Sequence, residues 1–174
     1  MSTRESDQIK ARSALVDEHI QSENRHDLDA VMATFGLEAR YDDEPWEDHR
    51  IGQDAVRSYY TELMRALPDV TIEVTRRHPA TDSLIVEVVI RGTHLGPWRG
   101  LPATGRSLEF PLCGIYEFDH DDRLASERIY YDRGVVLRQL GLFREPDNGF
   151  GRVATALGHP VTLARAYLRH PPRN

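Results

Sequence analysis

His94 has a side chain that can transfer protons, and it follows a strongly alternating apolar segment. Its position is in register with four apolar residues of the predicted strand before it: Leu84, Val86, Val88 and Ile90. In a continuous strand its imidazole therefore points to the same apolar side. There it can donate or accept a proton near neutral pH. The position also suits a buried histidine bonded to the backbone, or one at the solvent rim.

Asp132 lies at the end of the last predicted strand. Arg128 and Tyr130 share its face, whereas Ile129 and Tyr131 lie on the other. Because apolar residues lie on both faces, the pattern does not determine which face is buried. In an apolar hollow, a carboxyl group beside a phenol and a guanidinium can exchange a proton with carbon. An aspartate just before a predicted helix is equally typical of an N-cap.

Aromatic side chains gather where the mouth of a pocket would lie. Planar apolar ligands bind between such side chains, although aromatic residues also serve as plain core. The candidates are Tyr41, Trp46, Trp98 and Tyr116. The nearby acidic run, residues 42–44 and 47–49, includes His49 but lacks the spacing of a recognised metal motif. We expect a solvated loop there and no metal site.

The hydropathy pattern predicts helices first and strands afterwards. After Pro68 the apolar period changes from about 3.6 to about 2. Helices are expected at residues 6–24, 28–35 and 53–67, and strands at 38–44, 70–75, 84–90, 108–118 and 124–132. A short helix follows, through Leu140. This order indicates an α+β domain whose helices pack on one face of a curved antiparallel sheet.

Size and composition exclude several classes of protein. The 174 residues, 40% hydrophobic and 29% charged, are typical of one globular domain with a tail. A net charge of −6 argues against nucleic acid as a partner. The single cysteine, Cys113, cannot form an intramolecular disulfide. Without an apparent signal or membrane-spanning stretch, the pattern favours a cytoplasmic protein with no membrane partner.

Three segments together resemble the SnoaL-like polyketide cyclases. Gly92–Arg106 reads GTHLGPWRGLPATGR, with G-T-H-x-G before G-x-P-x-T-G-R, and Arg128–Leu142 reads RIYYDRGVVLRQLGL, with Tyr-x-Asp before Gln-Leu-Gly. His49–Val70 resembles the family's third helix, which starts at a glycine and ends in Pro-Asp. The similarity covers roughly Leu15–Leu142. The resemblance implies membership of the ketosteroid isomerase-like, or nuclear transport factor 2-like, superfamily.

The resemblance implies a conical α+β fold over residues 1–142, with a curved antiparallel sheet wrapped around one pocket and N-terminal helices. Residues 143–174 would form a C-terminal helical extension outside it. Members of this superfamily are commonly dimeric through the outer face of the sheet, so we expect a homodimer. The family's cyclases close a ring by aldol condensation without metal or organic cofactor.

By motif, the acid/base aspartate of these cyclases corresponds to Asp132 and the histidine of G-T-H to His94. We therefore expect a cofactor-independent enzyme of the cyclase, isomerase or dehydratase type, acting on a small apolar or aromatic carbonyl compound. Asp132 would take a proton next to the carbonyl, and His94 or Tyr116 would donate to the enolate oxygen. The residues expected to contact substrate are Tyr41, Trp46, His49, Trp98, Tyr116, Arg128 and Tyr130.

Two other functions are compatible with this fold. Proteins similar to limonene epoxide hydrolase use two aspartates bridged by an arginine to activate water, and Arg40 and Asp42 have an Arg-x-Asp spacing. The fold also serves as a non-catalytic module for ligand binding or dimerisation. An Asp–Arg–Asp bridge in the structure would favour hydrolysis, and one acid paired with histidine or tyrosine would favour proton transfer.

Overall fold

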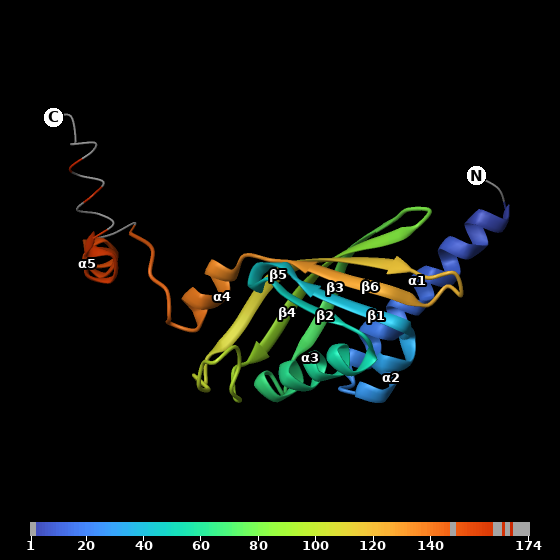
Figure 1. Ribbon diagram of the computed structural model, residues 1–174, viewed down its shortest axis with the longest axis horizontal. Coiled ribbons are helices and arrows are strands. Elements are labelled where there is room, and N and C mark those ends of the chain that lie inside the picture. Colours follow the sequence, from blue (N-terminus) through green and yellow to red (C-terminus); the bar gives the residue numbers. More distant parts are fainter. Residues whose placement is uncertain (1–2, 147–148, 162–164, 166–167, 169–174) are drawn as a thin grey trace. The chain divides into compact units, whose positions relative to one another are not determined.

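Figure 1 shows the computed structural model, which describes residues 3–146, 149–161, 165 and 168. The chain divides into two compact units, Met1–Leu140 and Gly141–Asn174. The strands listed below all belong to the first unit. Among the described residues, none of the helices combines the length and the hydropathy that a membrane span requires.

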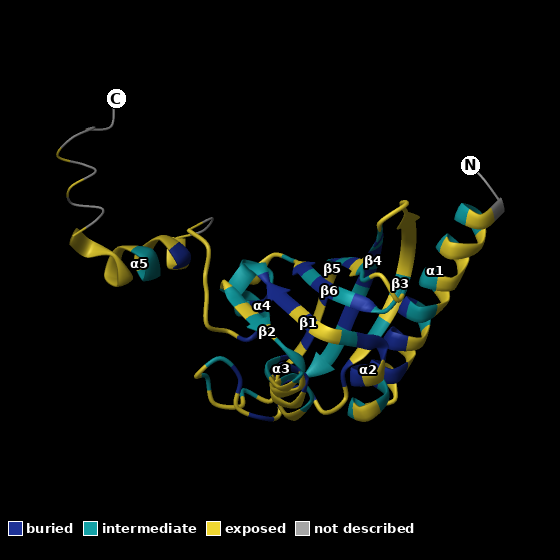
Figure 2. Ribbon diagram, turned by 45° about the vertical axis from the view of Figure 1, so that its right-hand side comes forward, coloured by how far each residue is buried: buried dark blue, intermediate teal, exposed yellow. Residues whose placement is uncertain are grey.

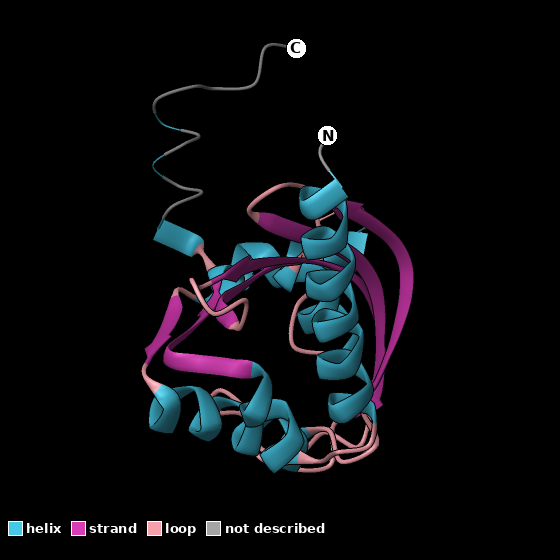
Figure 3. Cartoon of the chain, turned by 90° about the vertical axis from the view of Figure 1, so that its right-hand side faces the viewer, coloured by secondary structure: helices cyan, strands magenta, loops and turns pink. Residues whose placement is uncertain are grey.

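Helices α1 (Thr3–Asn24), α2 (Leu28–Thr34) and α3 (Gln53–Ala66) pack on one face of the sheet (Figure 3). Helix α3 starts after Gly52, whose φ of 89° is a conformation that favours glycine. It ends just before Pro68, which has no N–H to continue the helix. Its buried side carries Val56, Tyr59 and Tyr60. These bounds agree with the predicted third helix.

The six strands form one curved sheet. They are β1 (Phe35–Asp43), β2 (Asp48–Ile51), β3 (Thr71–Pro79), β4 (Ser83–Thr93), β5 (Ser107–Phe118) and β6 (Leu124–Tyr130), in the order β2-β1-β6-β5-β4-β3. Strands β1 and β6 run parallel, and the other neighbours are antiparallel. The predicted α+β architecture is confirmed, with this one parallel pair as a difference.

The acidic run, which begins within β1, is not the solvated loop expected from the sequence. It forms a short 3₁₀ helix, η1 (Glu44–Trp46), followed by strand β2. The side chains of Asp42 and Asp43 are fully buried. Strand β1 continues through Asp43, and each buried carboxylate pairs with a guanidinium group, Asp42 with Arg40 and Asp43 with Arg99, which makes the burial tolerable.

The core lies between the concave face of the sheet and the helices. Strand β4 buries every second residue from Leu84 to Ile90, as its alternating pattern predicts. Figure 2 shows buried residues along the sheet, while the outer sides of α1 and α3 are exposed. Helix α4 (Arg133–Gln139) follows β6 and completes this unit.

The second unit contains helix α5 (Gly149–Gly158), which falls within the predicted C-terminal extension. Phe150, Val153 and Leu157 are exposed on it. The remainder of that predicted extension lies partly outside the described residues, at 147–148, 162–164, 166–167 and 169–174.

Candidate active site

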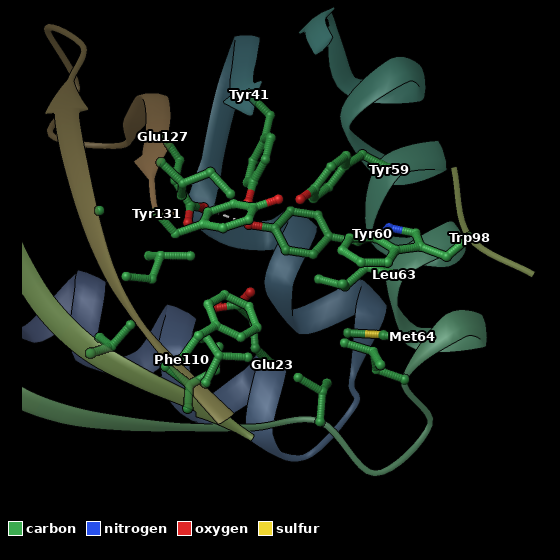
Figure 4. Close-up of a pocket in the computed structure, with 18 of the residues that line it drawn as sticks. Glu23, Tyr41, Tyr59, Tyr60, Leu63, Met64, Trp98, Phe110, Glu127 and Tyr131 are labelled. Atoms are coloured by element: carbon green, nitrogen blue, oxygen red, sulfur yellow. Dashed lines mark hydrogen bonds between the residues drawn. The ribbon is translucent and has the colours of Figure 1, made fainter. Parts of the chain in front are cut away.

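A cavity of about 60 Å³ lies between the sheet and helices α1 and α3. Figure 4 shows its wall, which is mostly aromatic and aliphatic and includes Phe110, Leu63 and Met64. A cavity of about 150 Å³ is known to hold benzene. A ring compound therefore enters this smaller space only if some of the lining side chains move.

Glu127 is a buried carboxyl group in the wall of this cavity. Its side chain comes from β6, and the residue is only 4% exposed. The Tyr60 hydroxyl donates to its Oε2 atom over 2.5 Å, and the Tyr116 hydroxyl donates to its Oε1 atom over 3.2 Å. Both bonds suit an ionised carboxylate, which only accepts hydrogen bonds. The site thus holds a desolvated hydrogen-bond acceptor beside an apolar space.

His19, on α1, lies behind Glu127 and is fully buried. The Thr34 hydroxyl donates to the Val31 carbonyl over 2.6 Å, so its oxygen is left to accept from Nδ1 of His19, 2.7 Å away. Nε2 of His19 lies 3.2 Å from Oε2 of Glu127. With Nδ1 as a donor and a carboxylate facing Nε2, the protonated imidazolium is the form that this network favours.

Glu23 lies one helical turn after His19 and also lines the cavity. Its Oε2 atom is 3.6 Å from the same Nε2 atom of His19. Burial raises the pKa of Glu23 to about 8, against the opposing charge of His19 and with a further increase from Glu127. Burial lowers the pKa of His19, but Glu23 and Glu127 outweigh it and raise that pKa above its ordinary value.

The cavity therefore brings together a neutral carboxylic acid from α1 and a hydrogen-bond-accepting carboxylate from β6, with the His19 imidazole close to both. When two neighbouring carboxyl groups are held in different protonation states, one can act as the acid and the other as the base. Glu23 can give a proton near neutral pH, and Glu127 can take one.

A second polar cluster lies beside the tyrosines of the cavity. Arg99 bridges two aspartates: its Nη2 atom donates to Oδ2 of the buried Asp43 over 2.5 Å, and its Nη1 atom donates to Asp48. The Tyr59 and Tyr131 hydroxyls each lie 3.4 Å from Oδ2 of Asp43. Burial raises the pKa of Asp43 despite the opposing effect of Arg99.

A sequence model of the SnoaL-like polyketide cyclases matches residues 13–140, which is most of the chain. The chain belongs to the SnoaL-like polyketide cyclase family. The family that three motifs predicted is thus confirmed. None of the curated proteins matches this sequence.

Solved structures share the SnoaL-like fold with this chain at low sequence identity. TsrD from Streptomyces laurentii is 19% identical, with a TM-score of 0.66, over 82% of this chain and 99% of that one. SalBIII, described as an epoxide hydrolase/cyclase-like enzyme with a role in pyran ring formation in salinomycin, is 21% identical to this chain. Its TM-score is 0.62, and the match covers 71% of this chain and 92% of that one. A protein of ketosteroid isomerase-like fold from Catenulispora acidiphila is 19% identical, with a TM-score of 0.62, over 74% and 92%.

In this SnoaL-like domain, Asp132 is not in the cavity, and its expected placement in a dry hollow is wrong. It is exposed and caps α4: its carboxylate accepts from the N–H of Gly134 over 2.7 Å and from that of Val135 over 3.3 Å. Strand β6 ends at Tyr130, and its inward face is that of Glu127 and Ile129. The catalytic role of Asp132 stays a prediction that this placement does not support.

The two residues that share a face with Asp132 also point away from the cavity. Arg128 lies 3.6 Å from Asp42 and 3.5 Å from Glu44, with which it forms ion pairs. Tyr130 is 43% exposed. Neither side chain lines the cavity, so their expected contact with a substrate there has no support in this arrangement.

His94 is fully buried, as the strand pattern indicated, but it does not line the cavity. Its Nδ1 atom accepts from the backbone N–H of Thr104 over 3.3 Å, and its ring lies 6.2 Å from that of Trp98. Burial lowers the pKa of His94. These contacts hold the segment between β4 and β5 together, and a catalytic role for His94 stays a prediction.

Of the predicted substrate contacts, Tyr41, Trp98 and Tyr116 line the cavity. Trp46 lies outside its wall and packs against Trp98, with 5.8 Å between ring centres. His49 is exposed and lies 2.8 Å from Asp42. The structure thus brings three of the predicted aromatic residues together around the cavity and separates the others from it.

Asp42, Glu44 and His49 offer ligand atoms within 4.8 Å of one another, a spacing that a metal ion could use. However, the Arg40 Nε atom lies 2.7 Å from Asp42, and Arg128 lies near both carboxylates. These guanidinium groups already supply the positive charge that a cation would bring.

The principal site residues were accessible to pattern analysis but were not identified by it. Glu127 shares its strand face with Ile129 and Tyr131, the face that the sequence left undecided. His19 and Glu23 lie four residues apart and continue the helical stripe of Val16 and Ile20. A polar residue inside a buried stripe was the available signal.

Proposed function

We propose that this SnoaL-like domain is a cofactor-independent acid/base enzyme that transfers a proton on a small apolar carbonyl compound, as a cyclase or isomerase does. The observation that carries the proposal is the pairing of Glu23 and Glu127 in one apolar cavity around His19. The proposal moves the acid/base role from Asp132 to these two carboxyl groups.

In the proposed mechanism, Glu127 takes the proton from the carbon next to the carbonyl group. Glu23 or the Tyr116 hydroxyl donates to the oxygen on which negative charge develops. The apolar wall excludes water, so each of these hydrogen bonds acts in a medium of low dielectric. His19 holds positive charge next to the Glu127 carboxyl group and fixes that side chain by an ion pair.

The test is deuterium exchange in D₂O, followed by NMR, at the carbon next to the carbonyl of cyclic ketones and 1,3-dicarbonyl compounds. We expect the wild-type protein to accelerate this exchange over buffer. Asp132→Asn should retain the rate within about threefold, because this side chain caps α4 outside the cavity, and asparagine caps a helix about as well as aspartate.

Glu117→Gln is the matched control for that assay, because Glu117 lies on β5 with an exposed side chain bonded to Ser126. Exchange by this variant should equal that of wild type. Loss of exchange in Asp132→Asn, with a stable fold and with Glu117→Gln unaffected, would return the base to Asp132.

A second candidate function is hydrolysis of an epoxide. It is favoured by the Asp43–Arg99–Asp48 bridge, an arrangement that can orient and activate a water molecule. The bridge does not use the Arg40–Asp42 pair that the sequence indicated; those residues form a separate ion pair. SalBIII, described as epoxide hydrolase/cyclase-like, shares the fold.

Incubation of a cyclic epoxide in ¹⁸O-labelled water distinguishes the two functions. If the bridge activates water, ¹⁸O-labelled diol forms, and Asp43→Asn lowers its rate by at least about 100-fold. Asp29→Asn is the matched control, since that aspartate is 88% exposed. If wild type forms no diol above the buffer rate, the hydrolytic candidate is wrong.

The predicted homodimer and cytoplasmic location stay predictions.

A further inference from the structure

The Asp43–Arg99 cluster contains buried polar atoms without hydrogen-bond partners among the described residues. They are Oδ1 of Asp43, Nε1 of Trp46 and Nε of Arg99. Buried polar atoms are almost always paired in folded proteins, because an unpaired one has lost its bonds to water without replacement. Three such atoms in one cluster indicate a site that can bind a polar group.

The three side chains are neighbours. Asp43 ends β1, and Trp46 follows within η1. Arg99 donates to the other oxygen of Asp43 over 2.5 Å, and its guanidinium carbon lies 5.6 Å from the centre of the Trp46 ring. The unpaired atoms thus belong to side chains in direct contact.

This cluster adjoins the cavity through Tyr59 and Tyr131, which line the cavity and reach Oδ2 of Asp43 over 3.4 Å each. Figure 4 shows the hydroxyl groups of these two tyrosines close to one another. Burial raises the pKa of Tyr131, and a hydrogen-bonding interaction with the Trp46 indole lowers it. The Trp46 N–H thus faces the Tyr131 hydroxyl, although it makes no hydrogen bond of ordinary geometry among the described residues. Bonds of 3.4 Å are long and are readily exchanged for shorter ones.

The unpaired atoms select a particular chemical group. Nε1 of Trp46 and Nε of Arg99 donate hydrogen bonds, and Oδ1 of Asp43 accepts one. A hydroxyl oxygen accepts two hydrogen bonds and donates one, so it satisfies all three. An ether or ketone oxygen cannot donate to Asp43, and a carboxylate or phosphate would be repelled by it.

We propose that Asp43, Trp46 and Arg99 bind the hydroxyl group of a ligand whose apolar ring occupies the cavity. The inference rests on the proposed function and deepens it, because it makes hydroxylated apolar carbonyl compounds the substrate class. The hydroxyl group anchors the ring at this cluster and leaves the remainder of the compound within the cavity of Glu127.

The test follows the indole N–H resonance of Trp46 in ¹H–¹⁵N spectra. The chain has two tryptophans, so Trp46→Phe assigns the resonance. The probes are cyclopentanol, cyclopentyl methyl ether and methylcyclopentane. We expect the alcohol to shift this resonance downfield and to bind at least about tenfold more tightly than the other two, because only it pairs all three atoms.

Asp43→Asn and Trp46→Phe should each reduce that preference to about twofold or less, while the exposed control Asp29→Asn should keep it. In Trp46→Phe, binding is followed through the indole N–H resonance of Trp98, which lines the cavity. Circular dichroism and thermal unfolding establish that each variant is folded, and Arg99→Lys is the second variant should Asp43→Asn not fold. Equal affinity for the three probes in wild type would overturn the inference. A Trp46 resonance that the alcohol does not shift would mean that only water binds at this cluster. That result would also overturn the inference, and it would favour hydrolysis of an epoxide.

This outcome is separable from that of the proposed function, because binding and exchange are measured on the same wild-type protein. Deuterium exchange without a preference for the alcohol contradicts only the hydroxyl site. A preference for the alcohol without exchange contradicts only the proton-transfer function.

Discussion

Replacing Glu127 by glutamine is expected to lower catalysed deuterium exchange by about 10²–10⁴-fold, the usual contribution of a general base. Glutamine keeps the length of the side chain and can still accept from Tyr60 through its amide oxygen. It cannot bind the proton removed from carbon. The loss should therefore appear in the rate of exchange rather than in substrate binding.

The substitution also removes the charge that faces His19, so the variant needs a control for loss of stability. Thermal unfolding establishes the folded fraction of Glu127→Gln, and Glu127→Asp tests whether a carboxylate at this position restores part of the rate. A folded Glu127→Gln protein that exchanges as fast as wild type would show that Glu127 is not the base.

The second large effect is expected for Glu23→Gln, which should change the free energy of unfolding and its dependence on pH. The ordinary pKa of glutamic acid is 4.5, and burial raises that of Glu23 to about 8 in the folded protein. Below the ordinary value both states bind the proton. As the pH rises from 4.5 towards 8, the unfolded chain releases a proton that the folded protein retains, so the free energy of unfolding falls.

Glutamine removes this dependence because it does not ionise. The free energy of unfolding of Glu23→Gln should therefore exceed that of wild type at the upper end of this range by at least about 1.4 kcal/mol, the equivalent of one pKa unit. The difference should vanish near the lower end. His19, whose pKa is also raised, acts in the same direction, so the two proteins are compared at each pH.

Urea unfolding across this pH range measures the difference, and Glu18→Gln is the control on the same helix. Glu18 is exposed and bonded to Arg25 over 2.7 Å, and that hydrogen bond lowers its pKa. The control should not remove the destabilisation at higher pH. Parallel pH profiles for wild type and Glu23→Gln would show that Glu23 keeps an ordinary pKa.

The fold could be predicted from the sequence because it depends on long, regular patterns. The alternation of β4 and the helical stripe that ends at Pro68 each involve many residues, and an error at one position changes little. The parallel pairing of β1 with β6 was not predictable in this way, because a hydropathy pattern carries no information on strand direction.

The site depends on two local features that hydropathy patterns do not predict: the residue at which β6 ends and the burial of Asp43. Strand β6 is apolar on both faces, and it ends at Tyr130, two residues earlier than predicted, which makes Asp132 an N-cap and not a pocket residue. Asp43 was assigned to a solvated loop because it lies in an acidic run, whereas the Arg99 guanidinium that makes its burial tolerable lies 56 residues away along the chain.

The central claim is that the cavity holds Glu23 as a neutral acid beside Glu127. The most direct measurement is a titration of the glutamate side-chain carboxyl carbons by ¹³C NMR, with Glu23 assigned by its absence from Glu23→Gln. We predict that the Glu23 carboxyl group titrates at a pKa of about 8. A midpoint near 4.5, its ordinary value, would mean that the group is ionised at neutral pH and would contradict the account.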